Sequence, residues 1–151
     1  TDVEDGLKLA INSILNNSYE GVRRVIDVSG DGHQNTDPSC SASGPSYNQA
    51  CAAVRAARDN AAANGIRVNG LAIEDGTYGA TGLTNWYNSN VRTADGFVVT
   101  AAGFDDFERA VITKIGAEII DQPPTVPEPA TLGMLGIALA GLGFVSRRRR
   151  G

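Results

Sequence analysis

The stretch RRVIDVSGDGHQNTD, residues 23–37, carries side chains that could bind a metal ion. An apolar run reaches Ser29 and breaks on Gly30-Asp31-Gly32, where the two glycines let the backbone turn and expose the carboxylate. The oxygen-bearing side chains around this break are Asp27, Ser29, Asp31, Asn35, Thr36 and Asp37. Ligands bind beyond the carboxyl ends of strands in open α/β sheets, so Asp31 is placed to hold a hard cation such as Mg²⁺, Mn²⁺ or Ca²⁺.

Two other interpretations of this stretch remain open. Asp-Gly is common in turns, so Asp31 could be a turn residue only. The stretch also matches five positions of a calcium loop of the EF-hand or dockerin kind, beginning at Asp27. Pro38 stands where that loop needs a bidentate carboxylate, and no helix follows it. Moreover, a strand that includes Asp27 cannot also curl from it, which favours the strand-end site.

His33 and the two cysteines offer other chemistry. His33 is the only histidine, and no Gly-x-Ser-x-Gly elbow accompanies it, so an exposed loop histidine is expected rather than a catalytic base. The spacing of His33, Cys40 and Cys51 matches no standard zinc pattern. A Cys40–Cys51 disulfide is the better interpretation in an exported protein, with free thiols as the alternative.

Alternating helices and strands must position these residues. Helical spacing and capping signals predict three main helices, and short β-branched runs predict three strands. A capping box at Ser46 and Gln49 predicts the start of the second helix, and Gly65 predicts its end. The apolar face of the third helix is predicted from its periodic residues, Phe104, Phe107, Val111, Ile115 and Ile119. The predicted order is helix 2–16, strand 23–29, loop 30–45, helix 46–64, strand 66–73, loop 75–95 with a short helix near 83–91, strand 96–100 and helix 104–119.

This order predicts an α/β fold, a partial doubly wound, Rossmann-like parallel sheet with right-handed crossovers. Three strands are few for such a sheet, and the chain opens directly on a helix at Thr1, so we expect a domain truncated at its N-terminus. We expect residues 1–120 to form this domain.

Charge is unevenly distributed along the chain. The net charge of the 151 residues is −4, but four of the 13 basic residues are Arg147–Arg150. Without them, 9 basic residues stand against 17 acidic ones, a net charge of −8. An acidic body argues against a nucleic-acid partner and suits an exported domain.

The C-terminal segments differ from the rest. Residues 121–129, DQPPTVPEP, form a Pro-rich linker, and residues 130–145, ATLGMLGIALAGLGFV, carry no charge before SRRRR. This tail resembles the PEP-CTERM sorting signal of Gram-negative bacteria, on Pro127, Glu128, Pro129, the apolar segment and Arg147, Arg148, Arg149 and Arg150. The resemblance implies export, transient retention in the inner membrane through residues 130–146, and processing by an exosortase near Pro-Glu-Pro. The alternative is a permanent C-terminal anchor made by residues 130–151.

The body resembles the second half of a von Willebrand factor A-like domain, of an uncharacterised bacterial branch. The resemblance rests on TDVEDGLKLA, RRVIDVSGDGHQN, NGIRVNGLAI and GFVVTAAGFDDFERAVITKI, and it covers residues 1–120. That superfamily builds a metal-ion-dependent adhesion site from three loops. By pattern Thr1 matches the second loop and Asp31 the third, while the Asp-x-Ser-x-Ser of the first loop is not in this chain.

The resemblance implies a divalent cation, Mg²⁺ first, whose open coordination position takes a partner's carboxylate. With the first loop missing, we expect this chain to bind metal weakly or not at all. Thr1 could equally be a helix N-cap, because Thr1-x-x-Glu4 is a capping box. Tyr78, Trp86 and Tyr87 could form a recognition surface or pack down as a loop cover, and we favour the cover.

The function predicted from the sequence is therefore an exported binding module that uses a cation to engage a protein or extracellular matrix ligand, at the cell surface, in the matrix or secreted. One alternative is a hydrolase that uses Asp31 or His33. The other is a structural component of the extracellular matrix.

Overall fold

The computed structural model describes residues 1–19, 21–37, 40 and 50–120. The linker, the apolar segment and the arginine cluster predicted after residue 120 lie outside these residues. Along the described part, helices and strands alternate as α1 (Val3–Leu15), β1 (Arg24–Gly30), α2 (Ala52–Ala63), β2 (Ile66–Ile73), α3 (Gly82–Asn90), β3 (Val98–Ala101), a short 3₁₀ turn η1 (Phe104–Asp106) and α4 (Phe107–Ile120). None of the described helices combines the length and the hydropathy that a membrane crossing needs.

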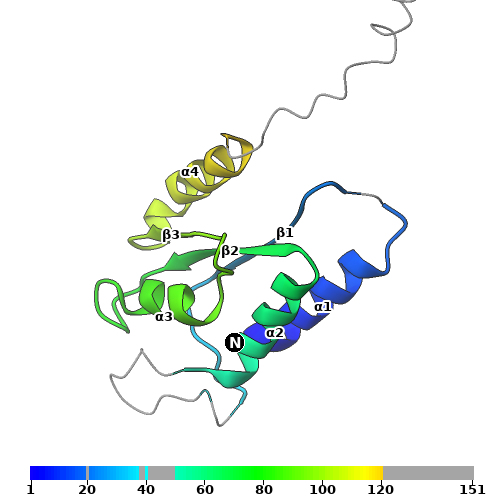
Figure 1. The fold of residues 1–151 in the computed structure, drawn as a ribbon. Coiled ribbons are helices and arrows are strands. Elements are labelled where there is room, and N and C mark those ends of the chain that lie inside the picture. The colour runs from blue at the N-terminus through cyan, green and yellow to red at the C-terminus, as the bar shows by residue number, and fades with distance from the viewer. Residues whose placement is uncertain (20, 38–39, 41–49, 121–151) are drawn as a thin grey trace, which may run out of the picture. The chain divides into compact units, whose positions relative to one another are not determined.

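The described strands form one parallel sheet in the order β1-β2-β3. In its register Arg24 lies beside Ile66 and Gly30 beside Ala72, while Ile73 lies beside Ala101. Figure 1 shows α1, α2 and α3 on one face of the sheet and α4 on the other. The predicted α/β class with parallel strands is confirmed.

The main core lies between the sheet and helices α1 to α3. Leu7 of α1, Val54 of α2 and Tyr87 of α3 are each at most 1% exposed and pack in the same cluster as Val68 of β2. On α1 the buried residues Val3, Leu7 and Ile11 recur every four positions, which is the spacing of one helical face. This core sets the position of α1 against the sheet.

The start of α1 and the start of α2 differ from the prediction. Asp2, not Thr1, is the N-cap of α1, because its carboxylate accepts a hydrogen bond from the Asp5 N–H at 3.1 Å. Helix α2 begins at Ala52 rather than at residue 46, and the N–H of its N-cap residue Cys51 donates to the Asn90 side chain at 2.9 Å. Ser46 and Gln49 lie outside the described residues.

Strand β3 begins two residues later than predicted, at Val98. Gly96 lies so close to β2 that a Cβ added to it would be 2.1 Å from the Val68 carbonyl oxygen. The Thr93 N–H and the Thr93 hydroxyl already bond to the Val68 backbone there. The chain therefore already lies alongside β2 at Gly96, two residues before the ladder of β3 begins.

The face that α4 buries is also different from the predicted one. The fractions exposed of Phe104, Ile115 and Ile119 are 64%, 49% and 62%, and the buried residues of α4 are Ala110 and Lys114. Two polar side chains of the sheet explain this rotation. Asp27 of β1 lies on this face and pairs with Lys114, and Lys114 also pairs with Glu118, which accepts from buried Asn69 at 2.9 Å. A half-buried carboxylate needs a cation, and the helix turns Lys114 inward to supply it.

Candidate functional site

The site predicted at the end of β1 is built around Asp31. The strand ends at Gly30, and Asp31 follows as an exposed residue. The next residue, Gly32, lies against Thr1: a Cβ added to Gly32 would be 3.1 Å from the Thr1 hydroxyl oxygen. The structure thus brings Thr1 beside the Asp-Gly turn, although 30 positions separate Thr1 from Asp31 in the sequence.

Asn35 holds Thr1 against this loop through two hydrogen bonds. Its side-chain oxygen accepts from the Thr1 amino group at 2.6 Å, and its backbone N–H donates to the Thr1 carbonyl oxygen at 3.2 Å. Because Asp2 caps α1, the Thr1 hydroxyl has no capping role and remains able to serve as a ligand.

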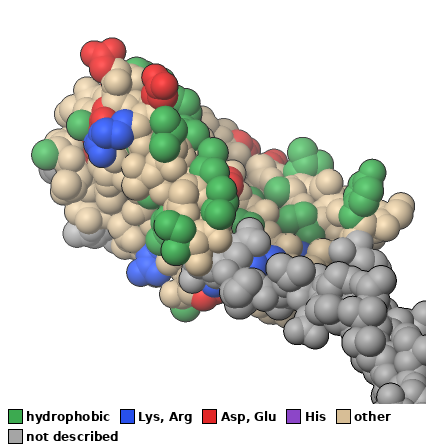
Figure 2. Space-filling view, turned by 90° about the horizontal axis from the view of Figure 1, so that it is seen from above, with side chains coloured by type: hydrophobic (Ala, Val, Ile, Leu, Met, Phe, Trp, Pro, Cys, Tyr) green, Lys and Arg blue, Asp and Glu red, His purple; other side chains and the backbone are tan. Residues whose placement is uncertain are grey.

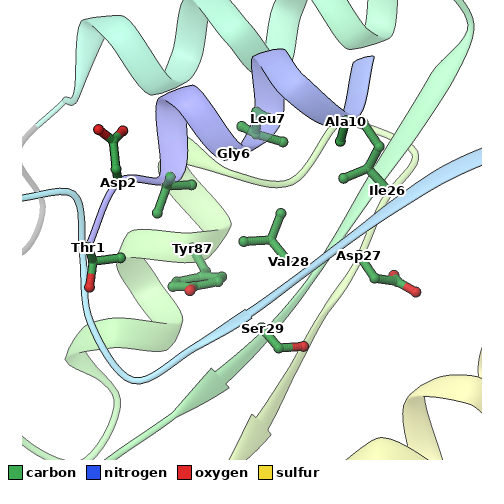
Figure 3. A pocket seen from close by; sticks show the side chains of 11 residues that line it. Thr1, Asp2, Gly6, Leu7, Ala10, Ile26, Asp27, Val28, Ser29 and Tyr87 are labelled. Atoms are coloured by element: carbon green, nitrogen blue, oxygen red, sulfur yellow. The ribbon is translucent and has the colours of Figure 1, made fainter. Parts of the chain in front are cut away.

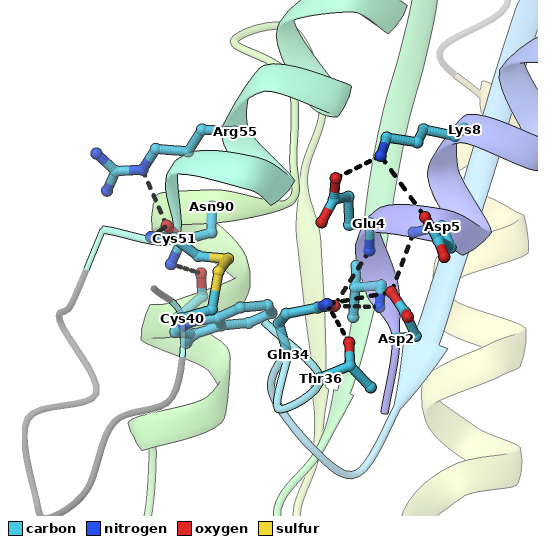
Figure 4. Close-up of a disulfide and its surroundings, with 12 residues drawn as sticks. Asp2, Glu4, Asp5, Lys8, Gln34, Thr36, Cys40, Cys51, Arg55 and Asn90 are labelled. Atoms are coloured by element: carbon cyan, nitrogen blue, oxygen red, sulfur yellow. Dashed lines mark hydrogen bonds and ion pairs between the residues drawn. A yellow bond between two sulfur atoms is a disulfide. The ribbon is translucent and has the colours of Figure 1, made fainter. Parts of the chain in front are cut away.

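Gln34 is the buried link between the loop and α1. It is 1% exposed, and its Oε1 accepts from the N–H groups of Val3 and Glu4 at 2.5 and 3.2 Å (Figure 4). Its Nε2 donates to Asp2 Oδ1 at 3.1 Å and to Thr36 Oγ1 at 2.6 Å. One side chain therefore satisfies two of the free N–H groups of the first helical turn and also holds the helix cap.

The electrostatics of Asp2 follow from these contacts. The hydrogen bond from the Asp5 N–H and the one from Gln34 lower the pKa of Asp2 below its ordinary value. The charged carboxylate also lies at the positive end of the helix dipole. Asp2 is therefore ionised, and its carboxylate serves as the N-cap of α1.

Tyr87 of α3 lies beneath the end of β1. A Cβ added to Gly30 would be 2.7 Å from its hydroxyl oxygen, and one added to Gly70 would be 2.9 Å from its ring. Both glycines are thus needed for the ring to lie this close to the sheet. Burial raises the pKa of Tyr87, and the nearby negative charge of Asp31 raises it further, so the hydroxyl stays protonated.

His33 belongs to an aromatic cluster rather than to an open loop. Its Nδ1 lies 3.0 Å from the Tyr78 hydroxyl, and its ring meets those of Tyr78 and Trp86 edge to face at 5.1 and 6.1 Å. Burial lowers the pKa of His33. Trp86 and Tyr87 are 2% and 1% exposed, so they pack down as the cover rather than forming a surface.

Asp27 and Ser29, the two further ligands considered, lie on the opposite face of β1. In Figure 3 both side chains point away from Thr1 and Tyr87, whereas Val28 points toward α1. Burial raises the pKa of Asp27 more than its pairing with Lys114 lowers it. The structure places Thr1 beside Gly32, the residue that follows Asp31, whereas the side chains of Asp27 and Ser29 point to the other face of β1.

A groove of about 270 Å³ runs beside this site, between α1 and β1 (Figure 3). It begins at Thr1 and Asp2 and is lined further along mainly by apolar and small side chains. Those further residues include Gly6, Leu7, Ala10, Ile26 and Val28. The polar site thus lies at one end of an apolar groove.

A disulfide joins Cys40 and Cys51 on the same side of the molecule (Figure 4). Both cysteines are at most 2% exposed. Cys51 directly precedes α2, and the Cys40 N–H donates to the Asp37 carbonyl oxygen at 2.9 Å. The disulfide therefore connects the end of the loop that carries Asp31 and Gln34 to the start of α2.

The donor set at Thr1 and Asp31 fits Mg²⁺ in kind, because it is one exposed carboxylate and one hydroxyl. It is small in number: among the described residues, no group of three His, Cys, Asp or Glu side chains could hold a metal ion. Mg²⁺ is commonly held by one or two carboxylates with several waters, so two protein ligands are compatible with a weak site.

Sequence reasoning missed two residues that position the site. Gln34 lies in the polar loop after the Asp31 turn, and nothing in the sequence around it pointed to hydrogen-bond partners in residues 2–4. Lys114 was not among the residues singled out from the sequence, because a lone lysine within an amphipathic helix is ordinarily exposed. The charge of Asp27 within a predicted strand was the one sequence signal for a cation partner, because a carboxylate that is partly buried there is stabilised by one.

Fold and site together define a three-stranded parallel α/β domain with a polar cluster at the end of its first strand. The family described as "Protein of unknown function (DUF1194)" matches residues 1–123, so the chain belongs to this family. The PEP-CTERM protein-sorting motif matches residues 125–150, which confirms the sorting signal predicted from the tail. No curated protein and no solved structure matches the chain.

The sorting motif has direct consequences for location. It implies an exported protein that is anchored transiently in the membrane and processed by an exosortase. The motif thus suggests an exosortase-processed extracellular or surface protein.

Proposed function

We propose that residues 1–120 form a binding module of the von Willebrand A-like type, which uses a divalent cation to engage an acidic group on a protein or matrix ligand. Thr1 and Asp31 would hold the cation, Mg²⁺ in the simplest case. The cation would supply an open coordination position for the ligand's carboxylate. No acid or base chemistry is required of the protein.

The observation that carries this proposal is the contact between Thr1 and the Asp31 turn. Two segments 30 residues apart are joined by three hydrogen-bonding side chains, Asn35, Gln34 and Asp2, and neither Thr1 nor Asp31 supplies the cap of α1. The strand end is also where open α/β sheets bind ligands.

A metal titration of the exported protein tests the proposal. We expect isothermal titration with Mn²⁺ or Mg²⁺ to detect a site that Asp31→Asn weakens by about tenfold or more, which corresponds to about 1.4 kcal/mol or more. Thr1→Val should weaken it by a smaller factor, because a neutral ligand is lost.

Asp27→Asn is the matched control, since it removes a carboxylate from the same strand but from the opposite face. It should leave the cation affinity unchanged. Equal affinities of the wild type and Asp31→Asn would contradict the proposal, and so would a loss in Asp27→Asn as large as that in Asp31→Asn.

A further inference from the structure

The outward face of α4 is apolar and carries no charge over its last three turns. Ile112, Ile115, Ile119 and Ile120, here called the isoleucine face, are 65%, 49%, 62% and 84% exposed. The charged residues of this part of α4, Lys114 and Glu118, pair with each other at 3.1 Å and lie toward the sheet. Figure 2, which views the molecule from above, shows a row of hydrophobic side chains on this side.

The spacing of these residues makes a continuous strip. Ile112, Ile115 and Ile119 follow one another at intervals of three and four, so they stack along one side of the helix. Leu9 of α1 is 72% exposed as well, but it stands alone among Asp5, Lys8 and Asn12. Exposed Glu108 and Arg109 adjoin Ile112 in the same way, but from Ile112 the apolar strip continues to Ile115 and Ile119. Single exposed hydrophobic residues are ordinary, whereas a contiguous apolar strip marks a binding surface.

The chain that follows indicates what this surface meets. Nine residues, 121–129, separate Ile120 from the apolar segment of the sorting motif. Nine residues span at most about 32 Å even when fully extended. While the tail is anchored, α4 is therefore confined to a thin layer next to the bilayer, and a short tether gives a high effective concentration.

We propose that the isoleucine face binds the interfacial region of the membrane while the sorting tail anchors the protein. A surface without charge gains only from its apolar area, so its binding is weak and reversible by itself. The tail supplies the second attachment. Cleavage at the sorting motif removes that attachment, and the face then leaves the membrane, which would release the domain in one step.

The test uses the full chain, with its tail, in phosphatidylethanolamine–phosphatidylglycerol vesicles. Ile112→Cys and Ile115→Cys each carry an environment-sensitive fluorophore, and Leu9→Cys carries the same label as the matched control. The two native cysteines are joined to each other, so each variant offers one thiol. Circular dichroism checks that each labelled variant is folded.

We expect brominated lipids to quench the fluorescence of the α4 labels at least threefold more than that of the Leu9 label. The emission of the α4 labels should also shift to the blue, and only when vesicles are present. Equal quenching at all three positions would overturn the proposal. A blue shift of the α4 labels without vesicles would also overturn it, because another polypeptide segment or a second copy would then cover the face. EDTA is present throughout, so the outcome does not depend on the cation site.

Discussion

Gln34 shows how much of the site depends on one buried amide. Its four hydrogen bonds join the Asp31 loop to the first turn of α1 and to the cap of that helix. Every buried side-chain nitrogen or oxygen in the described part of the chain has a partner, and Gln34 accounts for several of these pairings.

Replacing this amide by an apolar side chain of similar length should destabilise the fold. In Gln34→Met the Val3 and Glu4 N–H groups lose their acceptor while they remain largely covered. We expect a loss of about 1–3 kcal/mol in the free energy of unfolding, measured by urea titration. Asn85→Met is the control, because the exposed Asn85 amide makes a single contact of 3.5 Å. A loss no larger than that of the control would show that the amide does not hold the loop.

The sequence predicted the place of Asp31 but could not predict this support. A strand that ends on Gly-Asp-Gly has a local signature, so Asp31 could be placed beyond a parallel strand. Gln34 bonds residues about 30 positions away, and the identity of such partners depends on how α1 packs against β1. For the same reason the pattern Thr1-x-x-Glu4 suggested a cap that Asp2 in fact supplies.

At the scale of elements, the start of α1 should respond to pH through Asp2. Its pKa is lowered in the folded state, so its contribution to stability is present above the ordinary value of 3.8 and is lost as the pH falls below it. Asp2→Asn removes this titration. The difference in the free energy of unfolding between the wild type and Asp2→Asn should therefore be largest near neutral pH and shrink as the pH falls through the lowered pKa.

Urea unfolding from pH 7 to pH 2.5 measures this difference, and Asp105→Asn, at an exposed carboxylate, controls for the loss of a negative charge. A difference that stays constant over this range would contradict the assignment of Asp2 as an ionised cap.

The elements themselves were predictable where the local pattern matched the environment. Strand β2 has the predicted bounds because it is covered on both faces and reads as an apolar run. The last helix was placed correctly along the chain, but its predicted inward face was wrong, because the apolar periodicity placed Phe104 and Ile115 on it. An ion pair between buried Lys114 and half-exposed Asp27 reverses that assignment, and a hydrophobic pattern contains no information about such a pair.

At the scale of the whole molecule, the sorting motif and the described helices and strands occupy separate parts of the sequence. The sorting motif covers residues 125–150, while the parallel sheet and its helices end by Ile120. Processing near Pro127–Pro129 therefore removes no described helix or strand.

Mass spectrometry of the exported protein should find a C-terminus near Pro127–Pro129, without Arg147–Arg150. The intact chain isolated from cells that lack an exosortase is the control and should retain the arginines. A mature exported protein that still ends in the arginine cluster would show that the tail is a permanent anchor.

The close fit of Tyr87 against Gly30 and Gly70 has a consequence for how related sequences can vary. Each glycine leaves room for the same ring, and neither space is large enough for a methyl group while the ring is present. Substitutions at positions 30, 70 and 87 therefore depend on one another. Among descendants of a common ancestor, a side chain at position 30 or 70 should be accompanied by a smaller residue at position 87, so that substitutions on two strands and a helix are inherited as a set.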